Sequence, residues 1–250
     1  MIKVVIIGGG NVAYHLTSCL LKNKHIELIQ VFNRSLDKIQ YLKNKTLITN
    51  NLSELKEADI YIISVSDDAI SKLSSSLNLQ NKLVVHTSGS VAMNELQSKS
   101  RKGVFYLLQT FSKEKKIDFN TIPICIEAET DKDLKLLKTL AKSISKNIYH
   151  INSEQRKGIH VGAVFVNNFV NHLYHIGYEI CKENKVPFEI LHPLIQETAS
   201  KIVELTPFEA QTGPAKRNDT KTIQKHIAML PKNQQEIYTL LTKSISKTYE

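Results

Sequence analysis

The residues Ile2-Lys3-Val4-Val5-Ile6-Ile7-Gly8-Gly9-Gly10-Asn11-Val12-Ala13 open the chain with an apolar run and a glycine-rich turn. The run is apolar apart from Lys3, as is typical of a parallel β-strand that is buried on both faces. The turn has the spacing G-x-G-x-x-A, in which Gly8 permits a tight turn and Gly10 permits a pyrophosphate to approach the backbone. Since a helix follows, its free N–H groups would face that anion. We therefore expect Gly8, Gly10, Asn11 and Val12 to bind a dinucleotide.

The rest of the first half of the chain alternates between short β-branched runs and helical stretches. We expect helices over residues 11–21, 35–43, 68–77 and 131–145, and further strands over residues 26–32, 46–49, 60–65, 82–86, 103–108, 122–127 and 148–151. This alternation predicts an α/β fold with a doubly wound, mostly parallel sheet of the Rossmann type.

After Asn152 the pattern becomes helical. Asn152 and Gln155 have the spacing of a capping box. From Ile159 to about Glu183, apolar residues recur at spacings of three and four, and others extend the apolar character around most of the helix. Further helices are expected near 188–205, 219–230 and 233–247. We predict a Rossmann domain over 1–152 and an all-α domain over 153–250 that binds substrate and forms a homodimer.

The end of the second predicted strand indicates which dinucleotide is bound. Enzymes that use NAD place a carboxylate there, which grips the ribose 2′-hydroxyl. This chain has Asn33-Arg34-Ser35 instead, and Lys38 follows one helical turn after Arg34. A guanidinium can hold a 2′-phosphate through two hydrogen bonds, whereas a carboxylate would repel it. We therefore expect NADP as the cofactor, held by Asn33, Arg34 and Ser35; the alternative is that Arg34 is an ordinary surface arginine.

Two later loops follow strand ends, where doubly wound sheets bind their ligands. Val65, Ser66 and Asp67 follow the fourth strand and would line the riboses. Thr87, Ser88 and Gly89 follow the fifth, and their small side chains would suit the nicotinamide ring. The alternative is plain turn chemistry, which also favours Ser, Asp and Gly.

The composition is that of an ordinary globular protein, with 42% hydrophobic and 23% charged residues. No apolar run reaches the roughly 20 residues that a membrane span needs, and the early first strand leaves no room for a signal peptide, so we expect a cytoplasmic protein without a membrane partner. The net charge is +9, but the lysines are spread along the chain without adjacent aromatic stacking platforms. We therefore expect no nucleic-acid partner. The three widely spaced cysteines indicate neither disulfides nor a CxxC metal site.

Several motifs together resemble a known family: G-x-G-N-V-A, Asn-Arg-Ser after the second strand, Val-Ser-Asp-Asp-Ala-Ile, His-Thr-Ser-Gly-Ser, the run 104–111, residues 160–168 and residues 211–217. The chain is similar to a bacterial family of short dehydrogenase-like proteins. These join a Rossmann-like domain to a C-terminal domain of unknown function and are often labelled as similar to deazaflavin-dependent NADP oxidoreductases. The resemblance covers nearly the whole chain.

More distantly, the arrangement is similar to pyrroline-5-carboxylate reductase and the 6-phosphogluconate dehydrogenase superfamily. That resemblance implies a helical C-terminal domain that forms the dimer and closes the active site. The β-hydroxyacid dehydrogenases of the superfamily carry a catalytic lysine one turn before an Asn pair. Here Asn167-Asn168 is present, but Val164 occupies the position of the lysine. A lysine mechanism is therefore not expected.

Polar residues in the long helix supply the candidate catalytic groups. At about 100° per residue, His160, Asn167, Asn171 and His175 fall within one stripe. Buried polar groups need partners, so the stripe would form either a substrate pocket facing the nicotinamide or a polar seam at an interface. We expect His160 to donate a proton and Asn167 to orient a carbonyl. No metal is expected, because this His spacing lacks carboxylates.

A turn between the later helices, Thr212-Gly213-Pro214, is followed by Lys216, Arg217 and Asp219. Arg217 would suit an anionic substrate, or the segment is an exposed connection in which Asp219 caps the next helix. Together these features predict an NADP-dependent oxidoreductase that moves a hydride to or from a C=O or C=N carbon of a small molecule. The alternatives are a non-catalytic NADP-binding sensor or interaction protein and, less favoured, a nucleic-acid binder.

Overall fold

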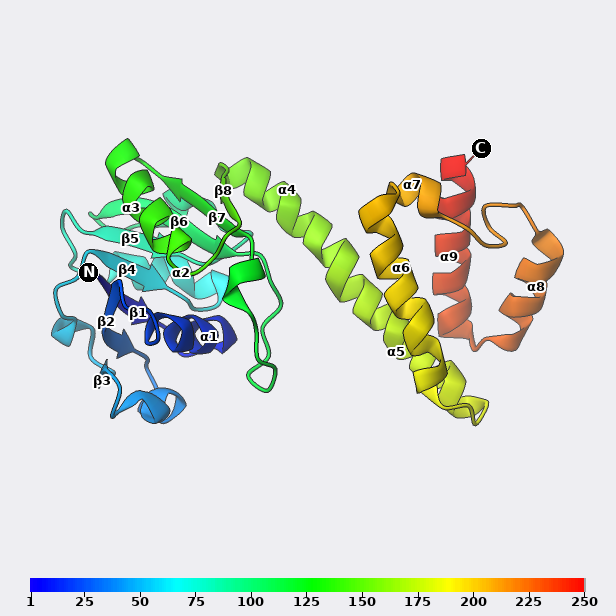
Figure 1. Ribbon diagram of the computed structural model, residues 1–250, viewed down its shortest axis with the longest axis horizontal. Coiled ribbons are helices and arrows are strands. Elements are labelled where there is room, and N and C mark those ends of the chain that lie inside the picture. Colours follow the sequence, from blue (N-terminus) through cyan, green and yellow to red (C-terminus); the bar gives the residue numbers. More distant parts are fainter. Residues whose placement is uncertain (250) are drawn as a thin grey trace. The chain divides into compact units, whose positions relative to one another are not determined.

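The computed structural model describes residues 1–249 and contains two compact units, Met1–Asn168 and Phe169–Glu250 (Figure 1). The first holds a β-sheet with its flanking helices, and the second is helical. The boundary expected after residue 152 falls where the last strand gives way to helix α4 (Ser153–Ala163), whereas the compact units divide later, within the same helical run. No helix of the described residues is long and apolar enough to cross a membrane.

The sheet has the doubly wound order β3-β2-β1-β4-β5-β6-β7-β8. Every neighbouring pair is parallel except β6 and β7, so the mostly parallel Rossmann-type sheet is confirmed. Each predicted strand is present. The strands are β1 (Ile2–Ile7), β2 (Ile26–Phe32), β3 (Leu47–Thr49), β4 (Ile60–Ile63), β5 (Leu83–His86), β6 (Arg101–Leu107), β7 (Ile124–Ala128) and β8 (Ile148–His150).

The core lies on both faces of this sheet. Alternate residues of β1 contribute to two separate apolar clusters, with Val4 and Ile6 in one and Val5 and Ile7 in the other. All four side chains are inaccessible to solvent, which explains why β1 is a continuous apolar run. Helices α1 (Asn11–Leu20), α2 (Asp67–Ser75) and α3 (Asp131–Lys142) accompany the sheet in this unit. The helix expected over 35–43 is a 3-10 helix, Leu36–Leu42.

The predicted capping box starts α4: the Asn152 side chain accepts from the Gln155 N–H, and the Gln155 side chain accepts from the Asn152 N–H, both at 2.9 Å. A π-helical segment, Val164–Phe169, then joins α4 to α5 (Val170–Glu183). The second unit continues with α6 (His192–Glu204), α7 (Pro207–Ala210), α8 (Thr220–Met229) and α9 (Lys232–Tyr249). Neither the π-helical segment nor the short helix α7 is expected from the sequence pattern.

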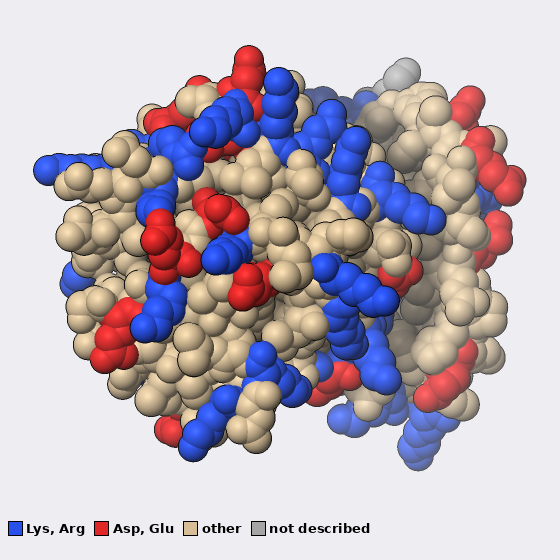
Figure 2. Space-filling model, turned by 60° about the vertical axis from the view of Figure 1, so that its left-hand side comes forward, with Lys and Arg blue, Asp and Glu red and all other residues tan. Residues whose placement is uncertain are grey.

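Several apolar side chains of the long helical run are exposed. Val161 is 59% exposed and Val166 is 74% exposed, and Leu173 further along the helix is also exposed. Charged residues are not gathered in one patch on the face that Figure 2 shows: Lys and Arg are spread over it, with Asp and Glu between them.

Candidate dinucleotide and substrate site

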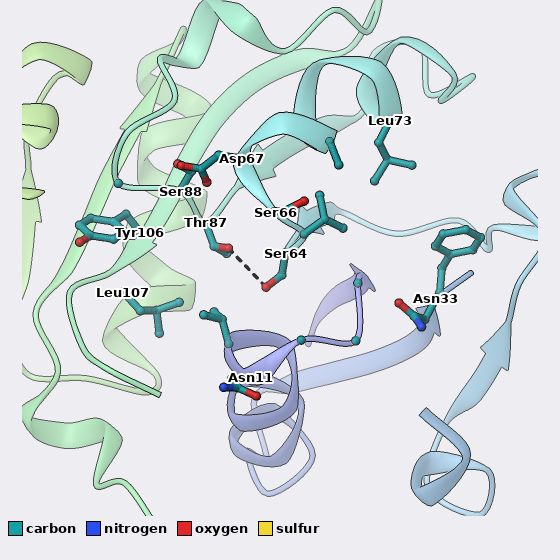
Figure 3. A pocket seen from close by; sticks show the side chains of 18 of the residues that line it. Asn11, Asn33, Ser64, Ser66, Asp67, Leu73, Thr87, Ser88, Tyr106 and Leu107 are labelled. Atoms are coloured by element: carbon teal, nitrogen blue, oxygen red, sulfur yellow. Dashed lines mark hydrogen bonds between the residues drawn. The ribbon is translucent and has the colours of Figure 1, made fainter. Parts of the chain in front are cut away.

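A cavity of about 760 Å³ lies at the carboxyl ends of the central strands of the first unit (Figure 3). It is the place where doubly wound sheets bind ligands. The lining residues come from five strand ends and the loops after them, from the 3-10 helix after β2, and from α2 and α4. They are Gly8–Val12, Phe32–Arg34, Lys38, Ser64–Asp67, Ala69, Lys72, Leu73, Ser76, Thr87–Gly89, Tyr106, Leu107, Gln109 and His160.

The glycine turn forms the floor of this cavity. Gly8 has a φ of +136°, and a Cβ there would lie 2.0 Å from the Ser64 carbonyl oxygen, so no other residue fits. Gly10 is open instead, with no atom within 4 Å of the position of a Cβ. No side chain caps the N-terminus of α1 at Gly10, so its first N–H groups remain available to an anion. The turn therefore fits a pyrophosphate in the way the spacing predicts.

The end of the cavity beside β2 is basic. Arg34 and Lys38 line it, and the neighbouring Asn33 side chain is held by donating to the Ser35 carbonyl oxygen at 2.8 Å. Lys72 of α2 also lines the cavity. Ser35 does not line the cavity, so its side chain is not among the groups that this surface offers to a ligand. Figure 3 shows Asn33 and Leu73 on one side and Tyr106 and Leu107 on the other. Asp67 is the one acidic residue among the lining residues.

A tyrosine and a histidine meet at the opposite end. The Tyr106 hydroxyl lies 3.0 Å from His160 Nδ1, which is hydrogen-bond distance. Gly89 makes this meeting possible: a Cβ there would lie 2.5 Å from His160 Nδ1 and 2.9 Å from Tyr106 Cζ. Gly89, from the loop predicted to contact the nicotinamide, therefore lies beside both Tyr106 and His160, the predicted proton donor. Tyr106 was missed from the sequence, although it is the penultimate residue of a parallel strand and strand ends line such sites.

Burial controls the protonation of two groups near this end. Burial raises the pKa of Tyr106 to about 12, with smaller contributions from Cys125 and Asp67, so the phenol is neutral at physiological pH. Burial also lowers the pKa of His86 to about 3, helped by repulsion from the Arg156 guanidinium. The neutral His86 ring accepts at Nδ1 from the Ser88 N–H at 3.2 Å. His86 therefore orders the loop that carries Gly89.

A buried ion pair fixes the start of α4 against the sheet. Arg156 is 1% exposed and donates to Glu127 at 2.5 Å and to the Val91 carbonyl oxygen at 2.6 Å. Ser153 completes the cluster by donating to the same carboxylate at 2.8 Å. Because Arg156 and His160 are one turn apart, the cluster also sets where the imidazole reaches the cavity.

Two predicted catalytic residues do not line this cavity. Asn167 is exposed and lies in the π-helical segment, where the 3.6-residue period behind the predicted stripe does not hold. Arg217 is exposed in the second unit. Its neighbours have structural contacts: Lys216 donates to the Gln211 carbonyl oxygen at 2.8 Å, and Asp219 caps α8 by accepting from the Thr222 N–H at 3.1 Å. These contacts are those of a helix connection. Among the described residues, no group of three or more His, Cys, Asp or Glu side chains could hold a metal ion.

Two family models match the chain. Residues 3–89 match "NADP oxidoreductase coenzyme F420-dependent", and residues 122–245 match the domain of unknown function DUF2520. No curated protein matches the chain in sequence.

Solved structures similar to the chain include the "putative NADP oxidoreductase" from Bacteroides fragilis, with 39% sequence identity, a TM-score of 0.90 and coverage of 98% of both chains. A reductive aminase from Aspergillus terreus, in complex with NADPH and ethyl levulinate, has 15% identity and a TM-score of 0.72, with 99% of this chain and 93% of that chain covered. A pyrroline-5-carboxylate reductase from Coxiella burnetii has 19% identity and a TM-score of 0.59, covering 99% and 97%. The last two show a shared fold.

Proposed function

The chain belongs to the same family as the Bacteroides fragilis protein, and from this premise we propose that it is an NADP-dependent oxidoreductase. The proposed reaction transfers a hydride between nicotinamide and the C=O or C=N carbon of a small molecule. The observation that carries the proposal is the cavity itself, which combines an open glycine turn with Arg34 and Lys38 after β2, where no carboxylate lines it. An anion-binding turn with two cations after the neighbouring strand matches a dinucleotide with an additional phosphate.

The lining residues divide between the parts of NADP by their position along the sheet. Gly8–Val12 would hold the pyrophosphate, and the cations beside β2 would hold the 2′-phosphate. Residues 65–67 would line the riboses, and 87–89 would contact the nicotinamide. When bound, NADPH supplies the hydride. The residues of the chain then have to bind the substrate, orient it and supply a proton, which we assign to the Tyr106–His160 pair.

The lining of the cavity also bears on the substrate class. No Lys or Arg lines the end near Tyr106, where the only charged neighbour in the lining is Asp67. The anionic substrate expected from Arg217 therefore has no support at this surface. We propose a substrate that is neutral at its reacting group, such as a ketone or an imine.

We further propose that the protein is a homodimer formed through the helical region. The large exposed apolar side chains of this region support the proposal: Val161, Val166, Leu173, Ile190, Leu194, Ile202, Val203, Phe208, Met229 and Leu240. Apolar surface of this extent is unusual in monomers.

The proposed function is tested by titrating NADPH calorimetrically and then measuring NADPH oxidation with ethyl levulinate and with a cyclic imine, 2-methyl-1-pyrroline. We expect saturable cofactor binding and turnover of at least one of these probes. Tight NADPH binding with no turnover of either, or of a wider panel of ketones and imines, would favour the non-catalytic sensor instead. Absence of NADPH binding would refute the proposal.

A further inference from the structure

We infer that Tyr106 is the residue that delivers the proton to the substrate, and that His160 restores this proton from the solvent. The inference rests on the proposed function and states the order in which the two side chains pass the proton. Its starting point is the hydrogen bond of 3.0 Å between the Tyr106 hydroxyl and His160 Nδ1.

Burial gives the order of the two groups. Tyr106 is 7% exposed and sits on the rigid end of β6, next to β5 and the loop that carries Gly89. His160 is half-buried and comes from α4, so its side chain is more accessible to water than that of Tyr106. Both line the cavity. A proton entering from solvent therefore reaches the imidazole first and the phenol second.

The glycine between them indicates that the contact is a required feature of this site. A Cβ at position 89 would lie 2.5 Å from Nδ1 and 2.8 Å from Cγ of His160, and 2.9 Å from Tyr106 Cζ. Both rings would have to move apart to admit one methyl group. A loop that only turned between β5 and the next segment would have no need of this clearance.

The proton transfers need no reactant other than the substrate, the hydride and water. During reduction, the substrate carbon gains a hydride while its oxygen or nitrogen takes the proton from the Tyr106 O–H bond. The phenolate then takes the Nδ1 proton of the His160 ring while Nε2 of the same ring takes a proton from water, whose hydroxide passes to the solvent. Because burial raises the pKa of Tyr106 to about 12, the phenol retains its proton at physiological pH until the substrate develops negative charge.

The first test compares variants with ethyl levulinate or 2-methyl-1-pyrroline as the probe. Tyr106→Phe should lower kcat by about 10²–10⁴-fold while NADPH binding is unchanged, since the phenol oxygen is lost and the ring stays. His160→Asn should lower kcat less than Tyr106→Phe does, because the phenol that donates the proton remains. Gly89→Ala should also lower kcat, because its methyl group would separate the two rings.

Two matched controls exclude a purely structural explanation. Tyr61→Phe removes another buried phenol from the same sheet, one that donates to the Lys56 carbonyl oxygen and does not line the cavity. It should change the melting temperature without lowering kcat. Gly162→Ala adds a methyl group in α4 where no atom lies within 4 Å, and it should leave kcat unchanged.

A second test needs neither substrate nor cofactor. Nitrogen-15 NMR of the nine histidines, with His160 assigned through His160→Asn, reports which ring nitrogen holds a proton. We expect a proton on Nδ1 at neutral pH in the wild type, and its loss from Nδ1 in the neutral ring of Tyr106→Phe.

The outcomes separate this inference from the proposed function. Turnover by the wild type together with a kcat for Tyr106→Phe within threefold of it would overturn the assignment of Tyr106 and leave the reductase standing. An Nδ1 without a proton throughout the active pH range would overturn the role of His160. If the wild type turns over none of the probes, both the assignment of Tyr106 and His160 and the proposed reductase function are refuted.

Discussion

At the level of single residues, the choice between NADP and NAD depends on charge at one strand end. Arg34 and Lys38 line the cavity after β2, and no carboxylate takes the place that would grip a 2′-hydroxyl. A guanidinium and a phosphate can form two parallel charge-assisted hydrogen bonds, whereas a carboxylate and a phosphate repel each other. The preference for NADP over NAD is thus set by the charged groups that follow β2.

We predict that the protein binds NADPH at least about tenfold more tightly than NADH, a difference of about 1.4 kcal/mol. Arg34→Asp should abolish this preference, because it replaces attraction by repulsion. Lys43→Asp is the matched control, since this exposed lysine lies just after the same 3-10 helix and outside the cavity. Calorimetric titration of both cofactors checks the prediction, and equal affinities in the wild type would contradict it.

His86 gives a second prediction at this scale. Its pKa in the folded protein is about 3, whereas an unperturbed imidazole has 6.5. Between these values the unfolded chain binds a proton that the folded protein does not, so the free energy of unfolding falls as the pH falls from about 6.5. The slope from this group should approach about 1.4 kcal/mol per pH unit. Denaturant titrations of the wild type and His86→Gln measure it; the same slope in both would refute the prediction.

At the level of elements, the position of α4 depends on a contact that local sequence does not reveal. The capping box starts this helix, but the buried pair between Arg156 and Glu127 attaches it to β7, and Arg156 also reaches the Val91 carbonyl oxygen. Removing one partner of such a pair leaves the other charge buried without compensation. The helix and the site that it serves are therefore coupled through this cluster.

We predict that Glu127→Gln or Arg156→Met lowers the free energy of unfolding by about 3–5 kcal/mol. Glu154→Gln is the control, because it removes an exposed ion pair with Lys157 from the same helix and should have little effect. Chemical denaturation of the three variants distinguishes the cases. Similar stabilities for all three would show that the buried cluster does not anchor α4.

At the level of the whole molecule, the exposed apolar side chains of the helical region account for the proposed dimer. We predict that Val166→Lys, at a position that is 74% exposed in the single chain, converts the dimer to a monomer because it would bury a charge at the interface. Leu47→Lys makes the same kind of change on β3, at a position 54% exposed, and should leave the dimer intact. Light scattering over a dilution series gives the mass, and a wild-type monomer at micromolar concentration would contradict the proposal.

The sequence was sufficient to predict the strands, the order of elements and the glycine turn of this protein. Each of these follows from short-range chemistry: β-branched runs favour strands, glycine permits a φ of +136° at Gly8, and Asn152 with Gln155 caps a helix. The preference for NADP also follows from local sequence, because Asn33-Arg34-Ser35 contains no carboxylate.

Only the tertiary structure brought Tyr106 and His160 together, since they are 54 residues apart and meet across a glycine from a third element. Asn167 does not line the cavity and lies in a π-helical segment, where the 3.6-residue period behind the predicted stripe does not hold. Which side chains meet depends on how rigid elements pack and where one is anchored, here by Arg156. These long-range distances are properties of the packed elements, and no spacing along the chain contains them.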